Sequence, residues 1–218
     1  MSLASWPVLG LVVTTPRLTL RTPTDNDFAG LLEAVDAGIH EPARMPFSFP
    51  WTDAEPGARR RSALQFWWNA RASWSPDAWT LLLAVFADGR AIGLQEVSAR
   101  QFPVLREVST GSWLTQSAQG QGLGKEMRAG VLALAFVELG AVVARSGAFE
   151  DNIASLAVSR SLGYRQNGTT REAPRGEART MVNFEITRDE WRLSVAPRFP
   201  VKVSGFAECK NMFGLDSV

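Results

Sequence analysis

The chain has 218 residues, of which 45% are hydrophobic and 21% charged, enough apolar content for one globular core and too much for a disordered or collagen-like chain. Its 23 lysines and arginines against 22 aspartates and glutamates leave a formal net charge of +1, which excludes the strongly basic surface of a nucleic-acid-binding protein. Cys209 and His40 are the only residues of their types, so we expect neither an internal disulfide nor a Cys/His metal site.

The sequence shows no segment typical of targeting or membrane insertion. Residues 1–7 lack the basic region of a secretory signal, and the apolar run 8–13 is not followed by a small-residue cleavage site. The longest apolar stretch, residues 129–144, contains Glu138 and Gly140, and its 16 residues fall short of the roughly 20 that span a bilayer. We therefore expect a cytoplasmic protein without a membrane partner.

The first half of the chain predicts one short strand, two helices and an antiparallel meander. Residues 17–21 alternate as a strand, and the Thr and Asp residues of 22–27 suit a helix N-cap. That helix has one apolar stripe, which ends before Gly38 and is formed by Phe28, Leu31, Leu32 and Val35. A second helix is expected over residues 55–73. Three strands with turns between them follow, over residues 79–86, 91–97 and 106–114.

Between the two helices, residues 41–56 predict a long irregular loop. Its four prolines disfavour regular secondary structure, and Phe47, Phe49 and Trp51 make it too aromatic for a disordered segment. We therefore interpret this loop as functional. The arginine run 59–61 in the following helix is typical of a solvated face.

The second half alternates helices and strands and ends in a tail. Helices are expected over 121–139 and 152–162, and strands over 142–147, 164–170 and 180–187. We place one α/β domain at residues 12–192 and a tail at 193–218, whose alternating stretch 201–206 suits an extra strand on its own domain or on a partner. Because the tail carries many apolar side chains, a self-association surface and a homo-oligomer are expected.

A glycine-rich loop where a strand ends and a helix begins carries the chemistry. Gly120, Gly122 and Gly124 allow backbone N–H groups to approach a ligand closely, and the helix dipole favours negative charge there. A Walker A loop is excluded, because Gln119 and Glu126 stand where it needs glycine and Ser/Thr. A dinucleotide fingerprint is excluded by Lys125, which stands where it needs its third glycine.

The pattern that remains, Gln119-x-x-Gly122-x-Gly124, resembles the GNAT superfamily of acyl-CoA-dependent N-acyltransferases, and the order of elements is similar across nearly the whole domain. The resemblance implies a GNAT fold: a mixed central sheet with an antiparallel N-terminal half and splayed parallel strands at the cofactor cleft, flanked by about four helices. It also implies that this loop holds the pyrophosphate of coenzyme A. The residues assigned to that cradle are Gln119, Gly120, Gln121, Gly122, Leu123, Gly124 and Lys125.

A second segment, from Asn152 through Ser155 to Leu162-Gly163-Tyr164, resembles the signature of the ribosomal-protein (RimJ/RimL-like) branch of that superfamily. The resemblance implies that Asn152 binds the pantetheine arm and that Ser155 lies near the thiol sulfur. Their i, i+3 spacing places both on one helix face, although a helix cap with an incidental serine is the simpler interpretation. As a whole, the chain is similar to mycobacterial members of the superfamily regarded as succinyltransferases.

N-acylation needs a deprotonated amine, a polarised thioester carbonyl and a proton for the departing thiolate. We assign the carbonyl and pantetheine contacts to the backbone of Trp113, Leu114 and Thr115, and the proton to Ser155. Ser109 occupies the position at which relatives of this type often carry the glutamate that acts as the base. The remaining candidates for the base are Glu107, which we favour, Glu96 on the neighbouring strand, and His40 beside the aromatic loop.

The expected activity is direct transfer of an acyl group from coenzyme A to the primary amine of a small molecule or protein, without a metal. Succinyl is favoured over acetyl, since a carboxylate removed from water needs a partner and arginines surround the expected acyl end. These arginines are Arg44, Arg59, Arg60, Arg61 and Arg71, with Arg106 also available. The alternative is a non-catalytic acyl-CoA-binding or sensing module, which the missing strand glutamate favours.

Overall fold

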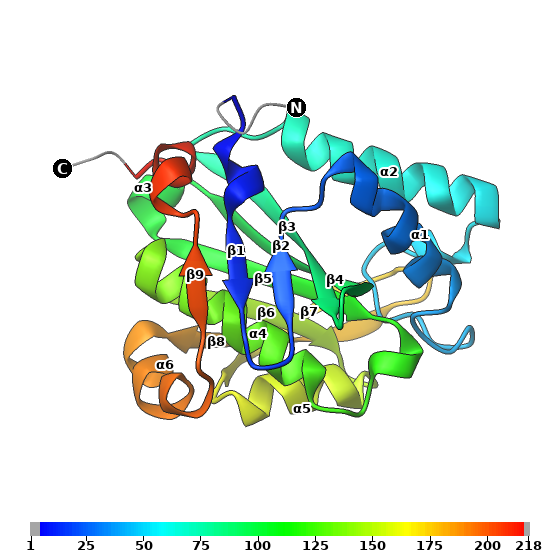
Figure 1. The fold of residues 1–218 in the computed structure, drawn as a ribbon. Helices are drawn as coiled ribbons and strands as arrows, with labels where there is room; N and C mark the ends of the chain where they lie inside the picture. Colours follow the sequence, from blue (N-terminus) through cyan, green and yellow to red (C-terminus); the bar gives the residue numbers. More distant parts are fainter. Residues whose placement is uncertain (1–4, 216–218) are drawn as a thin grey trace.

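The computed structural model describes residues 5–215; residues 1–4, where the targeting segment was sought, and 216–218, at the end of the predicted tail, lie outside the described residues. One sheet in the strand order β7-β8-β6-β5-β4-β3-β2-β1-β9 forms the centre of the fold (Figure 1). Its strands are β1 (Val12–Thr14), β2 (Thr19–Arg21), β3 (Ala78–Ala87), β4 (Arg90–Arg100), β5 (Glu107–Leu114), β6 (Val143–Phe149), β7 (Arg165–Glu172), β8 (Arg179–Thr187) and β9 (Lys202–Ser204).

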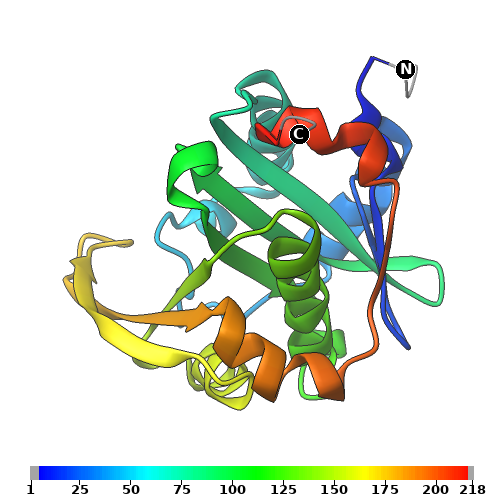
Figure 2. The ribbon, with the colours of Figure 1, turned by 90° about the vertical axis from the view of Figure 1, so that its left-hand side faces the viewer.

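Helices cover both faces of this sheet. They are α1 (Phe28–Asp36), α2 (Pro56–Ala72), α3 (Phe102–Leu105), α4 (Leu123–Ala133), α5 (Ile153–Ser161) and α6 (Arg188–Ser194). Successive side chains of a strand point to opposite faces, so β3 serves two cores. Leu81 and Leu83 pack with α4 in one core, whereas Leu82 and Ala84 pack with α1 and α2 in the other. Figure 2 shows α4 (green) lying across its face of the sheet, with α5 (yellow) below it.

The predicted GNAT-type sheet is confirmed. Strands β3, β4 and β5 form the antiparallel meander, and β5 pairs parallel with β6 from Glu107 opposite Val143 to Thr110 opposite Ser146. Both strands continue past this last pair, β5 to Leu114 and β6 to Phe149. The parallel strands therefore diverge beyond Thr110, which opens the sheet beside α4 and α5.

Short elements are where the structure differs most from the predicted ones. β1 has three residues, too few for a periodic pattern to reveal. The helix expected over 121–139 begins at Leu123 and passes into a π-helical turn at Leu134–Glu138. No helix within residues 5–215 combines the length and apolar character that crossing a membrane requires.

The tail packs on its own domain. β9 pairs antiparallel with β1, placing Val203 opposite Val13 at the edge of the sheet. A 3₁₀ segment, Ala207–Phe213, then buries Cys209 and Phe213 completely in the core on the α4 side. The apolar residues that favoured a self-association surface are thus covered largely within the chain.

Candidate active site

The glycine loop presents a row of free backbone donors. Gly120 and Gly122 adopt positive φ angles of 74° and 81°, and Gly122 is the N-cap of α4. Among the described residues, the N–H groups of residues 120–124 meet no protein acceptor, whereas the Gln119 N–H donates to the Gln116 carbonyl and the Lys125 N–H to the Gly122 carbonyl. Donors of this kind at the positive end of a helix dipole favour an anionic ligand.

Side chains on both sides hold this loop in place. The Gln119 amide Nε2 donates to the carbonyls of Ile39 (2.7 Å) and Leu114 (2.9 Å). The Glu126 carboxylate accepts from the Arg17 N–H (2.8 Å) and from Thr15 Oγ1 (2.7 Å). Although burial alone would raise it, these hydrogen bonds lower the pKa of Glu126. The cradle is therefore fixed before any ligand arrives.

A cleft of about 510 Å³ runs from this loop to the divergence of β5 and β6. It is lined by the end of β5, the start of α4 and the first turn of α5. Within that turn, Asn152 Oδ1 caps the helix by accepting the Ser155 N–H at 3.2 Å. Both residues line the cleft, so the cap and the predicted contact with the pantetheine arm are compatible. Lys125 lines it beside the free N–H groups.

Arg128 lies in the same cleft with only 4% of its surface exposed. Its guanidinium donates to Ser146 Oγ (2.9 Å) and Ser112 Oγ (3.3 Å), and its Nε has no partner. Within residues 5–215 no carboxylate forms an ion pair with it at 4.0 Å or less. A buried guanidinium without a counter-ion is costly, which marks this position as a place for an anionic group.

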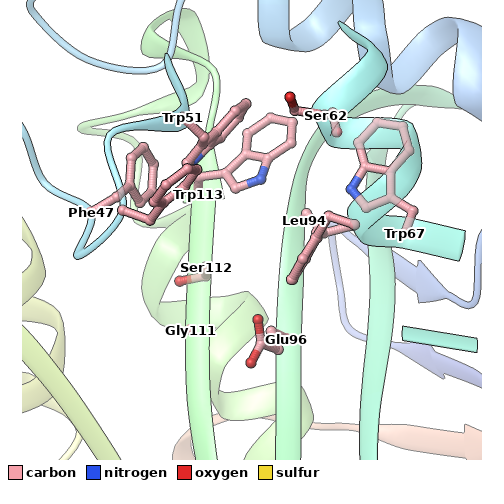
Figure 3. Close-up of a pocket in the computed structure, with 12 residues that line it drawn as sticks. Phe47, Trp51, Ser62, Trp67, Leu94, Glu96, Gly111, Ser112 and Trp113 are labelled. Carbon is pink, nitrogen blue, oxygen red and sulfur yellow. The ribbon is translucent and has the colours of Figure 1, made fainter. Parts of the chain in front are cut away.

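A second cavity of about 290 Å³ opens on the opposite face of β5, against α2 and the aromatic loop (Figure 3). It shares Phe47, Gly111, Ser112 and Trp113 with the first cleft, so the two meet at β5. Glu96, opposite Gly111 in the strand register, is its single ionisable lining residue. Figure 3 shows the carboxyl group of Glu96 directed toward Gly111. Burial raises the pKa of Glu96 above the ordinary glutamate value, opposed in part by a hydrogen bond with Ser98.

A family model described as an acetyltransferase (GNAT) domain matches residues 17–165. The chain belongs to the GNAT acetyltransferase family. Mycobacterium smegmatis RimJ in complex with CoA-disulfide has a TM-score of 0.69 and 18% identity, covering 94% of this chain and 95% of that one. RimL, a ribosomal-protein acetyltransferase in complex with coenzyme A, gives 0.66 and 17% over 82% and 99%. A GCN5-related N-acetyltransferase from Brucella melitensis gives 0.65 and 20% over 83% and 80%. These solved structures share the fold.

For this GNAT protein, the cleft fits coenzyme A. Free N–H groups and Lys125 suit a pyrophosphate, and the gap between β5 and β6 provides backbone donors for an extended amide-containing arm. Gln119, one of the predicted cradle residues, supports the loop instead. Its backbone N–H and its side-chain NH₂ group already donate to protein carbonyls. Among the described residues, no cluster of three potential metal ligands occurs.

The backbone donors predicted on β5 need correction. The Thr115 N–H donates to the Ile92 carbonyl on the β4 side (2.8 Å), so it is not available to a ligand. Because N–H groups alternate along a strand, the Trp113 N–H also faces β4, and those of Leu114 and Ser112 face the gap beside β6. Of the three predicted residues, only Leu114 has an N–H that faces the gap.

The surroundings of Glu107, the predicted base, do not favour that role. Arg145 donates to both of its carboxylate oxygens, at 3.0 and 3.1 Å. Glu107 begins β5, so the cleft residue Ser112 lies roughly 16 Å further along the strand. It lines a depression that Glu96 also lines, but neither of the two cavities that meet at β5. Glu96, the second candidate, lines the 290 Å³ cavity as well and pairs with Gly111, one of the residues that the two cavities share.

The third candidate, His40, organises the aromatic loop. One ring nitrogen lies 2.7 Å from Thr52 Oγ1, and the ring packs edge-on against Phe47 at 5.7 Å between centroids. It lines the 510 Å³ cleft but not the cavity that contains Glu96.

Most of the arginines expected around the acyl end have other partners. Arg59 and Arg60 pair with Asp36, and Arg71 pairs with Asp25. Arg61 is exposed and lines neither cavity, and Arg106 donates to the carbonyls of 103 and 139. Arg44 alone of the predicted set lines the 510 Å³ cleft. The residue that sequence reasoning missed is Arg128, although it lies three and four positions before Val131 and Leu132 on the apolar stripe of its helix.

Proposed function

We propose that this protein transfers an acyl group from a coenzyme A thioester to a primary amine in a direct ternary complex. The observation that carries the proposal is the meeting of two cavities at Gly111–Trp113. One has the anion cradle of residues 120–124, and the other has the partly buried carboxylate of Glu96. Donor and acceptor can therefore reach the same strand from opposite faces of the sheet.

The residues present can move the protons that this reaction requires. When bound, the thioester supplies an electrophilic carbonyl and a sulfur leaving group: the C–N bond forms, the C–S bond breaks, the amine loses a proton and the sulfur gains one. Glu96 accepts the amine proton, a role for which its raised pKa is suited. Ser155 and Leu114 both line the cleft; in this proposal the Ser155 hydroxyl delivers a proton to sulfur and the Leu114 N–H polarises the carbonyl.

The expected preference for a succinyl donor gains support from Arg128 in place of the arginines of α2. A guanidinium that is buried in the donor cleft and lacks a carboxylate partner is complementary to an acyl chain that ends in one. An acetyl group leaves this charge without a counter-ion. Arg44, on the aromatic loop, lines the same cleft and offers a second, more exposed cation.

Thiol release in the presence of primary amines, measured with succinyl-CoA and acetyl-CoA, tests the proposal. We expect turnover with both donors and a higher kcat/KM for succinyl-CoA. Arg128→Met should reduce the succinyl-to-acetyl ratio at least roughly tenfold, since hydrogen bonds to charged groups are worth more than 1.4 kcal/mol. Arg61→Met, on an exposed arginine of α2, is the control.

Two outcomes contradict the proposal separately. Tight binding of acyl-CoA with no thiol release for any amine supports the non-catalytic binding module instead. Turnover with a donor ratio that Arg128→Met leaves unchanged removes the charge-based preference for succinyl and retains the acyltransferase. The cytoplasmic location, the homo-oligomer and the choice between a small-molecule and a protein acceptor stay predictions.

A further inference from the structure

The cavity that contains Glu96 has a lining unlike the rest of the site. Seven of its side chains are large and apolar, and they come from the aromatic loop, α2, β4 and β5: Phe47, Phe49, Trp51, Phe66, Trp67, Leu94 and Trp113. Figure 3 shows most of these side chains gathered around the space above Glu96. The lining includes no lysine or arginine. Such a cavity binds an apolar group and tolerates one positive charge.

The aromatic rings support one another across separate parts of the chain. Trp51 lies 5.4 Å from Phe47 and 6.4 Å from Trp113, measured between ring centroids. Trp67 is buried and packs on Phe28 of α1 at 5.1 Å. These contacts hold the walls in place, so the cavity exists before a ligand binds and little ordering is lost when one does.

The mouth of this cavity exposes apolar surface. Phe49 is 72% and Phe66 48% exposed, and both line it. Exposed aromatic side chains at the rim of a cavity are typical of a ligand site, because binding removes their surface from water. At about 290 Å³ the cavity is just below the roughly 300–1,000 Å³ range of small-molecule sites, which suits a small ligand.

The charges nearby favour an ammonium without an adjacent carboxylate. Glu96 attracts a positive group at the floor, and aromatic faces attract it along the walls. A free amino acid would bring a second carboxylate within a few ångströms of Glu96, where like charges repel. The arginines of α2 that would repel an ammonium, Arg59 and Arg60, are paired with Asp36 outside the cavity.

We propose that the acceptor is a small primary amine joined by one or two carbons to an aromatic or similarly bulky apolar group, with the ring in this cavity and the nitrogen at Glu96. This inference rests on the proposed function. The bound ring positions the nitrogen beside Gly111, on the strand where the two cavities meet. Binding energy from the ring thereby orients the reacting atom.

The test compares four amines with saturating acyl-CoA: 2-phenylethylamine, propylamine, phenylalanine and a phenylalanyl dipeptide amide. We expect kcat/KM for 2-phenylethylamine to exceed that for each of the other three at least tenfold. Equal values for 2-phenylethylamine and propylamine overturn the proposal. A dipeptide amide that is the better substrate overturns the small-molecule acceptor and identifies a peptide N-terminus with an aromatic first residue.

A matched pair of variants on α2 tests the cavity itself. Phe66 and Trp68 are 48% and 49% exposed, but only Phe66 lines the cavity. Phe66→Ala should raise KM for 2-phenylethylamine at least fivefold and leave that for propylamine unchanged, whereas Trp68→Ala should change neither. Equal effects of the two variants contradict the proposal. Calorimetric binding of 2-phenylethylamine to the wild type and to Phe66→Ala distinguishes the two proposals: binding without any turnover contradicts only the proposed function.

Discussion

The 510 Å³ cleft proposed for the acyl donor (the donor cleft) and the 290 Å³ cavity proposed for the amine acceptor (the acceptor cavity) lie on opposite faces of β5 and are built in different ways. The donor cleft uses backbone N–H groups from one short loop, with positive charge from Lys125 and Arg128. The acceptor cavity uses aromatic side chains from the aromatic loop, α2 and β5, with Leu94 and one negative charge from Glu96 on β4. A phosphate ligand needs backbone geometry, which a few glycines specify locally, whereas an apolar ligand needs a shape that only the assembled fold provides.

One strand connects these two sites because its side chains alternate. Ser112 accepts a hydrogen bond from Arg128 on the α4 side, and Gly111 faces Glu96 on the α2 side. Gly111 has no side chain, and a Cβ there would be 4.0 Å from Glu96 Cβ. The alternation therefore places Arg128 and Glu96 on opposite faces of one strand, and Gly111 adds no side chain beside Glu96.

The largest expected effect is on the acceptor side, at Glu96. Glu96→Gln removes the base and should lower kcat roughly 10²- to 10⁴-fold, with acyl-CoA affinity unchanged. Glu107→Gln is the matched control on the same sheet face and should alter kcat little. A comparable loss in Glu107→Gln would restore Glu107 as the base. Both rates are measured by thiol release with one amine at saturation.

The pH dependence of this site follows from the same carboxylate. Its deprotonated form is the base, so the wild-type rate should rise with pH through a pKa above the ordinary glutamate value. The stability that Glu96 contributes is present below its unfolded pKa and is lost as pH rises through its raised folded pKa, so Glu96→Gln should melt higher than the wild type at pH 8 and similarly at pH 4. The other charged groups on its exposed side, Asp77, Arg100 and the Glu107–Arg145 pair, line the neighbouring depression.

The two sites also differ in how far the sequence predicts them. Gly120, Gly122 and Gly124 lie within five residues at a helix start, and Asn152 and Ser155 within one turn, so their proximity is local. Glu96 meets Gly111 through a pairing of β4 with β5 that depends on the register of the whole meander. The sequence predicted the order of most long elements, because amphipathic patterns are local. It predicted neither the ion pair between Glu107 and Arg145 nor the burial of Arg128, because both depend on contacts between distant elements.

A smaller effect, on coenzyme A affinity, is expected from a substitution in the glycine loop. Gly122→Asp places a carboxylate among the free N–H groups of residues 120–124, where it should lower coenzyme A affinity roughly 100-fold by occupying those donors and repelling the pyrophosphate. Its φ of +81° also strains any other residue. Calorimetry with coenzyme A gives the affinity.

Gly168→Asp is the control for that backbone strain. Gly168, in β7, has a φ of +84° and no atom within 4 Å of an added Cβ, so the same substitution carries a similar strain of about 1–2 kcal/mol away from the cleft. The melting temperatures of both variants should therefore fall by similar amounts, and only Gly122→Asp should bind coenzyme A more weakly. Equal coenzyme A affinities in the two variants would contradict the cradle.

The smallest expected effects separate Ser155 from Asn152 within one turn of α5. Ser155→Ala removes the hydroxyl that we propose protonates the sulfur. It should lower kcat about tenfold with unchanged coenzyme A affinity, since the contribution of general acids starts at roughly 10²-fold and a serine hydroxyl is a weak acid. Its N–H still donates to Asn152 Oδ1, so the helix cap and the melting temperature should persist. An unchanged kcat would reduce Ser155 to a packing residue.

Asn152 has two roles that substitution can separate, because its oxygen caps α5 while its NH₂ group is left for the donor cleft. Asn152→Ala removes both and should cost about 1 kcal/mol of stability as well as coenzyme A affinity. Asn152→Asp keeps the oxygen that accepts the Ser155 N–H but replaces the NH₂ donor with a negative oxygen. It should therefore retain the wild-type melting temperature and still lose affinity severalfold. If Asn152→Asp binds coenzyme A as the wild type does, Asn152 is a helix cap alone, and recognition of the donor rests on the backbone of the loop and of β5.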